Sequence, residues 1–385
     1  MQKHSYYLAK HLAQQGVFVD VYHAIPHGKP LQNPTDAFSD EELKYLTFIP
    51  VPFPRNHYFP GHYIWESYLY SKRVYKQFAE RQEVDFVYVQ GFSGWQLIKR
   101  KGAKTQSHNK RLPVGINFHG VEMFQKAPSL RVKLEHLLLR PFVKSNLRKA
   151  GAIFSLGGKL TAIQKRLSPT GNMIEMPIGI THDWLNEDAC LTSSGVTKFV
   201  FIGRYERRKG IEELNTVLRQ LIQTGSSFEF HFIGPIPKSK QLTINQSINL
   251  PTSPPNPLIA YHGAIHNEKE IQQILRDSDI LVCPSWSEGM PTVILEAMAS
   301  GCAIIATDVG AVSEQVDASN GLLIQPGNRQ QLKSAIEKML TLPAKELLQM
   351  KKASIERIKE KFLWDQVAQR TIEEIKRVIG EKKRE

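Results

Sequence analysis

Short apolar runs that end in glycine recur along this chain, and they constrain its fold more than any other feature. Residues 198–203 and 228–234 are clear cases, and residues 85–91 and 259–263 follow the same plan. Such runs are typical of strands that are buried on both faces, as in a parallel sheet. Helical patterns alternate with them, so the sequence predicts an α/β fold built from repeated strand–helix units.

The strand–helix alternation occurs in two series, and 385 residues are more than one ordinary core needs, so we expect two domains. A polar stretch over 182–196 separates the series. We expect a Rossmann-like domain over 1–181, a linker over 182–197, a second Rossmann-like domain over 198–360, and a terminal helix over 361–385 that crosses back to the first domain. Two doubly wound domains of this kind face a cleft, and ligands bind beyond the carboxyl ends of their strands.

The composition is that of a soluble globular protein, with 41% hydrophobic and 23% charged residues. No run approaches the roughly 18 apolar residues that a membrane helix needs, and the N-terminus lacks the apolar core of a signal peptide. The three cysteines, Cys190, Cys283 and Cys302, form neither a disulfide framework nor a metal-binding spacing. We therefore expect a cytoplasmic protein.

Positive charge is concentrated in the first half, because residues 1–150 carry about +11 of the formal net charge of +13. Its main sources are a basic segment over 98–111 and a helical pattern over 130–149. In that helix we expect Leu134, Leu137, Leu138, Phe142 and Leu147 to point inward and Arg131, Lys133, Arg140, Lys144, Arg148 and Lys149 to point outward. Two interpretations stay open, a peripheral site at the anionic inner face of the cell membrane and a plain solvated surface. Nucleic acid is not expected, because the basic segments lack interleaved aromatic residues.

The stretch 285–301 combines two carboxylates with the start of a helix. A buried-type strand over 280–284 leads into it, and Pro291 is placed to begin the helix. Glu288 then lies in the turn before the helix and Glu296 on its second turn, so both can face one pocket. The amides around Gly289 and Thr292 have no helical acceptor and suit an anion. Carboxylates for hydroxyl groups and amides for phosphate together suit a sugar nucleotide.

A second loop carries the cations that such a ligand needs. Arg204 and Lys209 follow the strand over 198–203, and five residues apart they can grip a diphosphate. A solvated basic loop is the alternative. Residues 277–279 read Asp-Ser-Asp, which looks like a metal-binding motif. They end a helix before a buried strand, where such residues cap and turn, so we expect no metal there.

The second half of the chain resembles the donor-binding half of family 4 retaining glycosyltransferases, which have the GT-B fold. The resemblance rests on Gly203-Arg204 with Lys209-Gly210, on Glu288 and Glu296 as an E-x7-E pair, and on residues 289–301 around that pair. The first half resembles the family more loosely, through Phe118-His119-Gly120 and 177–180.

The resemblance implies a hexosyltransferase that moves a sugar from a UDP- or GDP-sugar to a hydroxyl of a glycan or lipid-linked acceptor in cell-surface polysaccharide or lipopolysaccharide synthesis. It implies retention of configuration and no cofactor besides the donor. Glu288 would bind sugar hydroxyls, Glu296 the ribose, and Arg204 and Lys209 the diphosphate, while His119 would approach the sugar from the other domain. The implied catalytic residues are His119, Glu288, Arg204 and Lys209, and the implied donor contacts are Gly203, Arg204, Lys209, Ile265, Glu288, Gly289, Met290, Thr292 and Glu296.

The chain also departs from the family pattern. The family opens with a strand and a Gly-Gly turn before the helix with which this chain begins, so we expect that strand and turn to be missing here. Val309-Gly310-Ala311 stands where the family often has a double glycine. Three alternatives therefore remain: a truncated homologue that only binds nucleotide or membrane, a nucleotide-sugar epimerase, and a sugar-phosphate synthase on the same fold.

Overall fold

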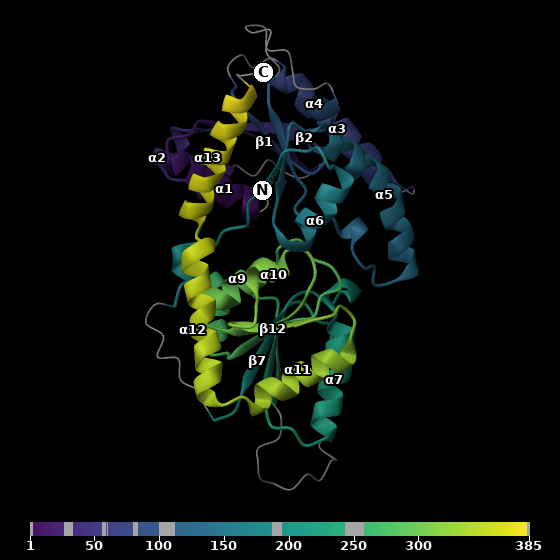
Figure 1. The fold of residues 1–385 in the computed structure, drawn as a ribbon, viewed down its shortest axis with the longest axis vertical. Coiled ribbons are helices and arrows are strands. Elements are labelled where there is room, and N and C mark those ends of the chain that lie inside the picture. Colours follow the sequence, from purple (N-terminus) through teal and green to yellow (C-terminus); the bar gives the residue numbers. More distant parts are fainter. Residues whose placement is uncertain are drawn as a thin grey trace. The chain divides into compact units, whose positions relative to one another are not determined.

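A computed structural model describes residues 3–26, 34–55, 59, 61–79, 84–99, 112–186, 195–242 and 258–382 (Figure 1). The chain divides into two compact α/β units. The first unit contains residues 1–124, 131–179 and 364–385, and the second contains residues 125–130 and 180–363. The predicted limits at 181, 197 and 360 stay predictions.

The second unit is built around a parallel sheet of six strands among the described residues. Their order across the sheet is β12-β11-β10-β7-β8-β9. The strands are β7 (Lys198–Ile202), β8 (Glu229–Ile233), β9 (Leu258–Gly263), β10 (Ile280–Cys283), β11 (Ala303–Thr307) and β12 (Gly321–Ile324). The strands expected at 198–203, 228–234, 259–263, 280–284 and 303–306 are therefore present, whereas β12 was not anticipated.

The helices of the second unit are α7 (Ile211–Gln223), α8 (Glu268–Arg276), α9 (Thr292–Ala299), α10 (Val312–Gln315), α11 (Arg329–Thr341) and α12 (Ala344–Lys361). Single turns of 3-10 helix lie at His182–Trp184, Arg207–Lys209 and Lys238–Lys240. Aromatic side chains fill the core, where the rings of Phe230 and Phe232 lie 4.7 Å apart and those of Phe199 and Phe230 lie 6.0 Å apart. These rings are shielded from solvent, and their packing is worth more than their buried area alone.

The order of the strands creates a switch point between β7 and β10. From β7 the chain proceeds to β8 and β9 on one side, and then returns to place β10 on the other side of β7. Ile280 and Leu281 of β10 pair in parallel with Phe199 and Val200 of β7. The loops that follow β7 and β10 therefore leave the same edge of the sheet side by side, which is where open α/β sheets bind ligands.

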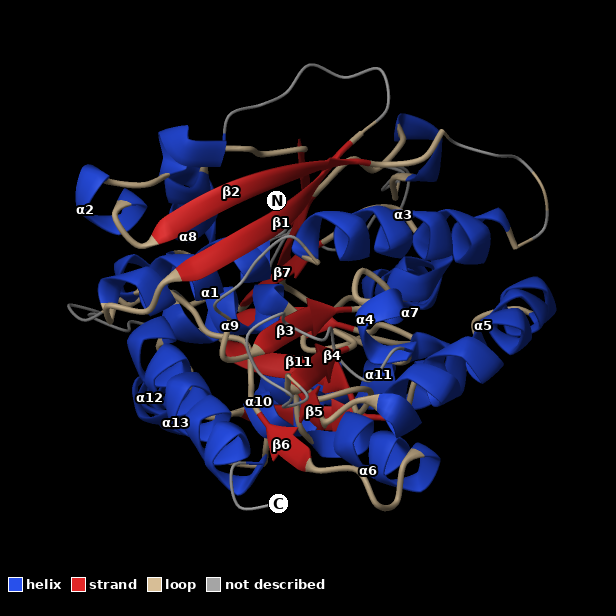
Figure 2. Cartoon of the chain, turned by 90° about the horizontal axis from the view of Figure 1, so that it is seen from above, coloured by secondary structure: helices blue, strands red, loops and turns tan. Residues whose placement is uncertain are grey.

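The first unit contains two parallel sheets, one of β1 and β2 and one in the order β3-β4-β5-β6. The strands are β1 (Val19–Ile25), β2 (Leu46–Pro52), β3 (Val87–Gln90), β4 (Val114–Asn117), β5 (Ala152–Ser155) and β6 (Met173–Glu175). The helices are α1 (Lys3–Gln14), α2 (Asp40–Leu43), α3 (His62–Phe78), α4 (Trp95–Lys99), α5 (Leu130–Lys149), α6 (Gly158–Leu167) and α13 (Trp364–Lys382), with 3-10 turns at Pro34–Ala37 and Glu122–Phe124. In Figure 2, α3 lies beside β2, with which it is in contact.

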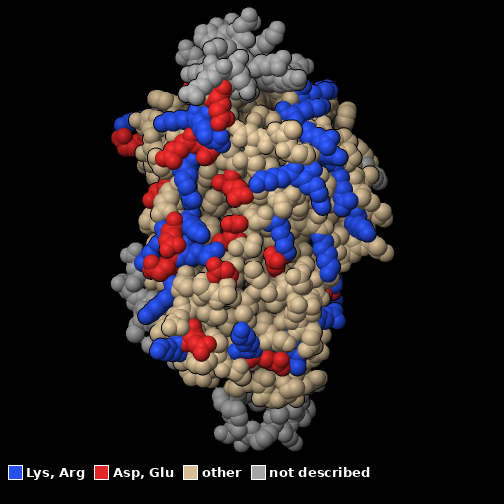
Figure 3. All heavy atoms as spheres, viewed as in Figure 1, with Lys and Arg blue, Asp and Glu red and all other residues tan. Residues whose placement is uncertain are grey.

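The prediction for the helix over 130–149 was right about its bounds and about Leu147 but wrong about three other leucines. The side chains of Leu134, Leu137 and Leu138 were expected inside, yet these residues are 65%, 44% and 52% exposed. The buried face of α5 consists of Val143, Asn146 and Leu147. Helical periodicity identifies which residues share a face, but it does not say which face meets the rest of the protein. Figure 3 shows Lys and Arg side chains gathered over α5 at the upper right.

Two other expectations fall partly on residues that the structure does not describe. Of the basic segment 98–111, residues 98 and 99 belong to α4, while residues 100–111 lie outside the described part of the chain. The sequence from Tyr63 to Arg81 also predicts a helix, which the structure shows as α3; it ends at Phe78, and Arg81 itself is not described. Among the described residues, no helix is long and apolar enough to cross a membrane.

A buried ion pair explains the Asp-Ser-Asp sequence at 277–279. Asp279 lies between α8 and β10, and its Oδ1 accepts from Lys351 Nζ of α12 at 2.8 Å. Its Oδ2 accepts from the backbone N–H of Lys198 at 3.0 Å. Both ion-pair partners are about 95% buried. The carboxylate therefore joins α12 to the first residue of the central strand β7.

Replacing Lys351 tests this link. In Lys351→Met the Asp279 carboxylate stays buried without its cation, and removing one member of a buried pair costs about 3–5 kcal/mol. We expect that loss in the free energy of unfolding, measured by urea denaturation. The exposed Lys345→Met on the same helix should change it by less than about 0.5 kcal/mol. Adding Asp279→Asn to Lys351→Met should restore part of the loss; equal effects of the two Lys variants would contradict the role of the pair.

Candidate functional site

The loop after β7 carries the basic residues that the sequence singled out. Gly203 follows the strand, and a 3-10 turn over Arg207–Lys209 leads to Gly210, which precedes α7. Gly210 has a φ of +69°, and a Cβ atom there would lie 2.0 Å from the carbonyl oxygen of Pro284. Only glycine therefore allows this loop to approach the loop that follows β10.

The loop over 284–291 is held from three directions. The backbone N–H of Trp286 donates to the carbonyl of Arg208 at 2.7 Å, which joins the two loops. From the loop after β11, the N–H of Ala311 donates to the carbonyl of Gly289 at 2.8 Å. Gln125, in the short segment 125–130 of the same unit, donates from Nε2 to the carbonyl of Glu288 at 2.7 Å. The loop that carries Glu288 is thus fixed by backbone bonds at several points.

Gly310 is a second position where only glycine fits. Its φ is +55°, and a Cβ atom would lie 2.2 Å from the carbonyl oxygen of Glu288 and 2.3 Å from that of Gly289. The sequence marked Val309-Gly310-Ala311 only as a departure from a family pattern. The available signal was a glycine shortly after the buried run 303–306.

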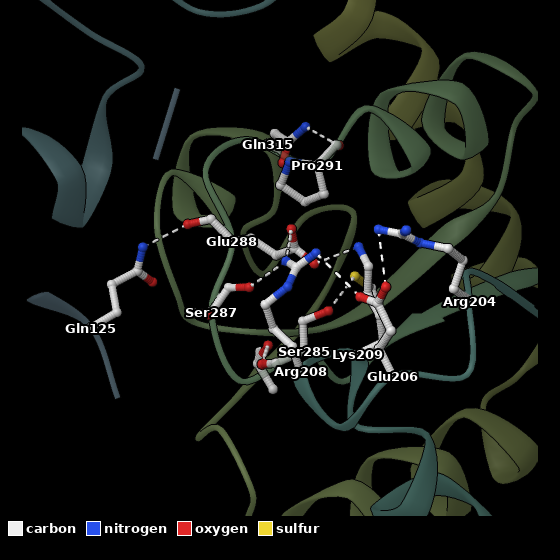
Figure 4. A network of polar contacts seen from close by, with 12 residues as sticks. Gln125, Arg204, Glu206, Arg208, Lys209, Ser285, Ser287, Glu288, Pro291 and Gln315 are labelled. Atoms are coloured by element: carbon white, nitrogen blue, oxygen red, sulfur yellow. Dashed lines mark hydrogen bonds and ion pairs between the residues drawn. The ribbon is translucent and has the colours of Figure 1, made fainter. Parts of the chain in front are cut away.

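The side chain of Glu288 is the centre of the site. It is 8% exposed, and its Oε1 accepts from Lys209 Nζ at 2.8 Å. Its Oε2 accepts from Arg208 Nη1 at 3.2 Å, and the same nitrogen donates to the carbonyl of Ser287 at 3.1 Å. Figure 4 shows Arg208 and Lys209 converging on this carboxylate. A buried carboxylate needs such partners. Arg208 also lies 3.8 Å from Glu206 Oε2 through Nη2, so the three cations Arg204, Arg208 and Lys209 face two carboxylates, Glu206 and Glu288, and positive charge is in excess.

Arg204 and Lys209 contact two different carboxylates of the cluster, Glu206 and Glu288. Arg204 is 68% exposed and contacts Glu206 Oε1 through Nη2 at 3.0 Å, and Figure 4 shows its guanidinium directed toward Glu206. Arg208, which the sequence reasoning did not single out, joins Lys209 at Glu288. The 3-10 turn over Arg207–Lys209 starts only after Arg204. The diphosphate-binding role of Arg204 therefore stays a prediction.

The other predicted donor contacts lie in α9, in the turn before it and in the loop after β9. Helix α9 begins at Thr292, one residue later than expected, with Pro291 at its N-cap and no side-chain cap. Glu296 lies on its second turn and is 8% exposed. Met290 is buried, whereas Gly289 and Thr292 are half-buried. Ile265 is also half-buried, but it follows β9 at the far edge of the sheet.

Trp286 is a member of the site that the sequence reasoning missed. Arg207 and Lys126 each lie 5.1 Å from the centroid of its ring. The indole Nε1 donates to Glu213 Oε2 at 3.3 Å, and Glu213 is also ion-paired with Arg207. Cations against an aromatic ring are attracted to its face. The indole thus anchors the loop before Glu288, although nothing in the sequence separated it from an ordinary core tryptophan.

His119 lies in the first unit, directly after β4. Its Nε2 is 3.0 Å from Gln90 Oε1, and the ring of His4 meets it edge-on with centroids 4.6 Å apart. Burial lowers the pKa of His119 to about 4. Burial and the neighbouring His119 lower the pKa of His4 to about 3. Neither ring nitrogen of His4 has a hydrogen-bond partner among the described residues. Both imidazoles are therefore neutral at pH 7, and His119 offers a hydrogen-bonding group rather than a cation.

The lowered pKa values of His4 and His119 predict that the folded protein loses stability in mild acid. Between the folded pKa of about 4 and the ordinary histidine pKa of 6.5, the unfolded chain binds a proton at His119 that the folded chain does not. The free energy of unfolding should therefore fall as pH drops through this range, by up to about 1.4 kcal/mol per pH unit for each such histidine.

Urea denaturation from pH 7 to pH 4.5 measures this slope, and His4→Phe should reduce it. The variant keeps a ring of similar size at a site where the imidazole makes no hydrogen bond. In NMR spectra, the His119 ring should remain neutral at pH 5.5. A midpoint near 6.5 for His119 would contradict the buried, neutral arrangement.

Comparison with known proteins places this site in a known class of domain. Residues 196–342 match the family model described as "Glycosyl transferases group 1". TuaC of Bacillus subtilis (strain 168), named as a glycosyltransferase of teichuronic acid biosynthesis, is 31% identical over 205 residues. That alignment covers 50% of this chain and 48% of TuaC. The chain thus spans about half the length of this curated relative.

Two solved structures resemble nearly the whole chain. Sucrose-phosphate synthase from Thermosynechococcus elongatus has a TM-score of 0.73 at 19% identity and covers 97% of this chain and 92% of its own. An E. coli structure described as "Trehalose-6-phosphate", bound with UDP-2-fluoro glucose, has a TM-score of 0.69 at 12% identity. The alignment covers 96% of this chain and 95% of the E. coli chain. These likenesses confirm the predicted GT-B fold of two Rossmann-like domains. Together with the matched family model they support a glycosyltransferase family, while family 4 membership and retention stay predictions.

Proposed function

We propose that this protein transfers a sugar from a nucleotide-diphosphate-sugar to a hydroxyl of a glycan or lipid-linked acceptor in the synthesis of a cell-surface polysaccharide or lipopolysaccharide. One observation carries the proposal: a buried carboxylate, Glu288, held by Lys209 and Arg208 at the switch point between β7 and β10. The cluster lies inside the segment that matches the group 1 glycosyltransferase model. The name of TuaC supports the polysaccharide product class.

The charges suit a diphosphate. When a donor binds, its phosphate oxygens share the charge of Lys209 and Arg208, which in the structure compensate Glu288 and, for Arg208, also Glu206. Arg204, exposed and paired only with a half-buried Glu206 in the described structure, can add a bidentate contact. The first N–H groups of α9 lack intrahelical acceptors and face the same loop. These groups stabilise the negative charge that develops on the departing nucleotide.

The carboxylates suit the sugar and the ribose. Once the diphosphate draws Lys209 and Arg208, the oxygens of Glu288 become available to accept from sugar hydroxyls. In this proposal Glu296, eight residues further along and on the second turn of α9, accepts from the ribose hydroxyls.

The proposed reaction retains configuration at the anomeric carbon. The bond from that carbon to the phosphate oxygen breaks while the acceptor oxygen bonds on the same face. The departing phosphate oxygen takes the acceptor's proton, so atoms and charge balance without a covalent enzyme intermediate. A UDP-sugar or GDP-sugar donor fits this scheme, and the E. coli structure that resembles this chain is bound with UDP-2-fluoro glucose.

Removing Lys209 tests the diphosphate contact. We expect Lys209→Ala to weaken UDP or GDP binding by roughly 1.5–3 kcal/mol, the scale of a charge-assisted hydrogen bond. Isothermal titration calorimetry measures the affinity, and Lys352→Ala, an exposed lysine on α12, serves as the matched control. Unchanged affinity in Lys209→Ala, with the fold intact, would contradict the assignment.

Glu288→Gln separates binding from turnover. The substitution removes the charge that competes for Lys209 and Arg208, so nucleotide diphosphate without sugar should bind at least as tightly. The amide cannot replace both carboxylate acceptors for sugar hydroxyls, so we expect donor turnover to fall at least about a hundredfold, as when a transition-state contact is lost.

A panel of UDP- and GDP-sugars with the unmodified protein tests the activity directly. Released nucleotide and transferred or free sugar are measured together. Nucleotide binding without any turnover across the panel would overturn the transferase proposal and favour a protein that only binds nucleotide. Interconversion of the donor sugar without nucleotide release would favour an epimerase.

A further inference from the structure

Helix α5 exposes a row of leucines that its own unit does not cover. We define the leucine stripe as Leu134, Leu137 and Leu138, which are 65%, 44% and 52% exposed. Residues three and four apart share one face of a helix, so these side chains lie together. The face that α5 buries is the opposite one, with Val143, Asn146 and Leu147. Figures 1 and 2 both place α5 at the edge of the first unit.

Beyond the leucine stripe, the same face of α5 carries mainly basic residues. In steps of three and four, Leu134 and Leu137 are followed by Pro141, Lys144 and Arg148, and each of these is exposed. Lys133 and Lys149 are also exposed. Within the helix, Glu135 is the sole acidic residue against six basic ones. Figure 3 shows blue side chains along this part of the surface. An apolar row flanked and extended by Lys and Arg is the pattern of a helix that lies in a membrane interface.

Aromatic side chains extend this apolar surface toward α3. Trp65 and Tyr63 of α3 are 48% and 54% exposed. The rings of Trp65 and Tyr68 lie 6.2 Å apart, those of Tyr68 and Trp95 5.5 Å, and those of Trp95 and Phe142 of α5 5.4 Å. A continuous series of ring contacts thus runs from the exposed indole of Trp65 to α5. Tryptophan and tyrosine are enriched at the boundary between lipid and water.

The basic residues around the leucine stripe indicate the charge of the partner that would cover this face. We propose that α5 docks on an anionic lipid surface, with the leucine stripe inserted at the acyl boundary and Lys133, Lys144 and Lys149 among the lipid phosphates. The apolar row alone would suit a protein partner equally well. The basic residues along and beside the row, with a single acidic residue on the helix, favour a uniformly anionic surface instead. This inference does not depend on the proposed transferase activity, because lipid binding needs no donor.

Co-sedimentation with vesicles tests the proposal. The full chain is mixed with phosphatidylglycerol-containing vesicles or with pure phosphatidylcholine vesicles, and the bound fraction is measured against lipid concentration. We expect binding to the anionic vesicles that weakens as salt rises, and little binding to the neutral ones. Leu134→Ser/Leu137→Ser/Leu138→Ser should lower the affinity at least about tenfold, because apolar burial contributes to interfacial binding. Lys133→Gln/Lys144→Gln should lower it by about 25-fold, at roughly fivefold for each basic residue near the surface.

Matched controls make the result specific to α5. Leu258→Ser changes a leucine that is 53% exposed in the second unit, and Lys345→Gln/Lys352→Gln changes two exposed lysines of α12. Both controls should bind vesicles as the unmodified chain does. All targets are exposed, and circular dichroism with a thermal melt confirms that each variant is folded.

Three outcomes would overturn the proposal. The first is a triple serine variant that binds anionic vesicles as tightly as the unmodified chain. The second is equal binding to neutral and anionic vesicles, because the charge argument then fails. The third is an unmodified chain that binds neither vesicle but sediments as an oligomer that the serine variant dissociates, which would make the stripe a contact between protein chains.

Discussion

The arrangement of the candidate site depends on one buried carboxylate, that of Glu288. Glu288 is removed from water, so it requires cations close by, and the loop after β7 supplies Lys209 and Arg208. Bringing that loop so near demands close contact between backbones, which Gly210 permits on one side and Gly310 on the other. Backbone bonds to Trp286 and Ala311 then hold the geometry. The protein's own charge balance thus gathers three cations, Arg204, Arg208 and Lys209, around two carboxylates, which is the arrangement that the proposed anion site uses.

The parallel sheet explains why these loops meet at all. β7 and β10 are neighbours although 77 residues lie between their ends, and the chain reverses its direction of winding between them. Both strands are short and, after Lys198 at the start of β7, apolar, and the phenylalanines of β7 and β8 pack on one another in the core. The buried link between Asp279 and Lys351 secures the other end of the same two strands. Rigid strand ends are what allow two loops to hold charged groups at hydrogen-bonding distances.

The sequence predicted the framework well and the partners of individual side chains less well. Glycine-terminated apolar runs located most strands, and helix α5 has the predicted bounds of 130–149, because these signals are local. Arg208 and Gly310 were missed because their importance depends on loops that meet only in three dimensions. Leu134, Leu137 and Leu138 were placed inside because periodicity was read as burial, whereas the residues that α5 buries, Val143, Asn146 and Leu147, lie on its opposite face. Residues 100–111, which contributed to the expected basic surface, lie outside the described part of the chain.

The second unit includes a short segment, residues 125–130, that lies within the sequence of the first unit. Gln125 holds the carbonyl of Glu288, and Lys126 donates to the carbonyl of Pro326 while covering the ring of Trp286. Both residues come from a stretch of chain flanked on each side by the first unit. A gene segment for residues 196–342 alone would carry the charged cluster to a new host without these two supports. The family model matches residues 196–342 of the sequence, but in the structure the loops of that segment are also supported by Gln125 and Lys126, which lie outside it.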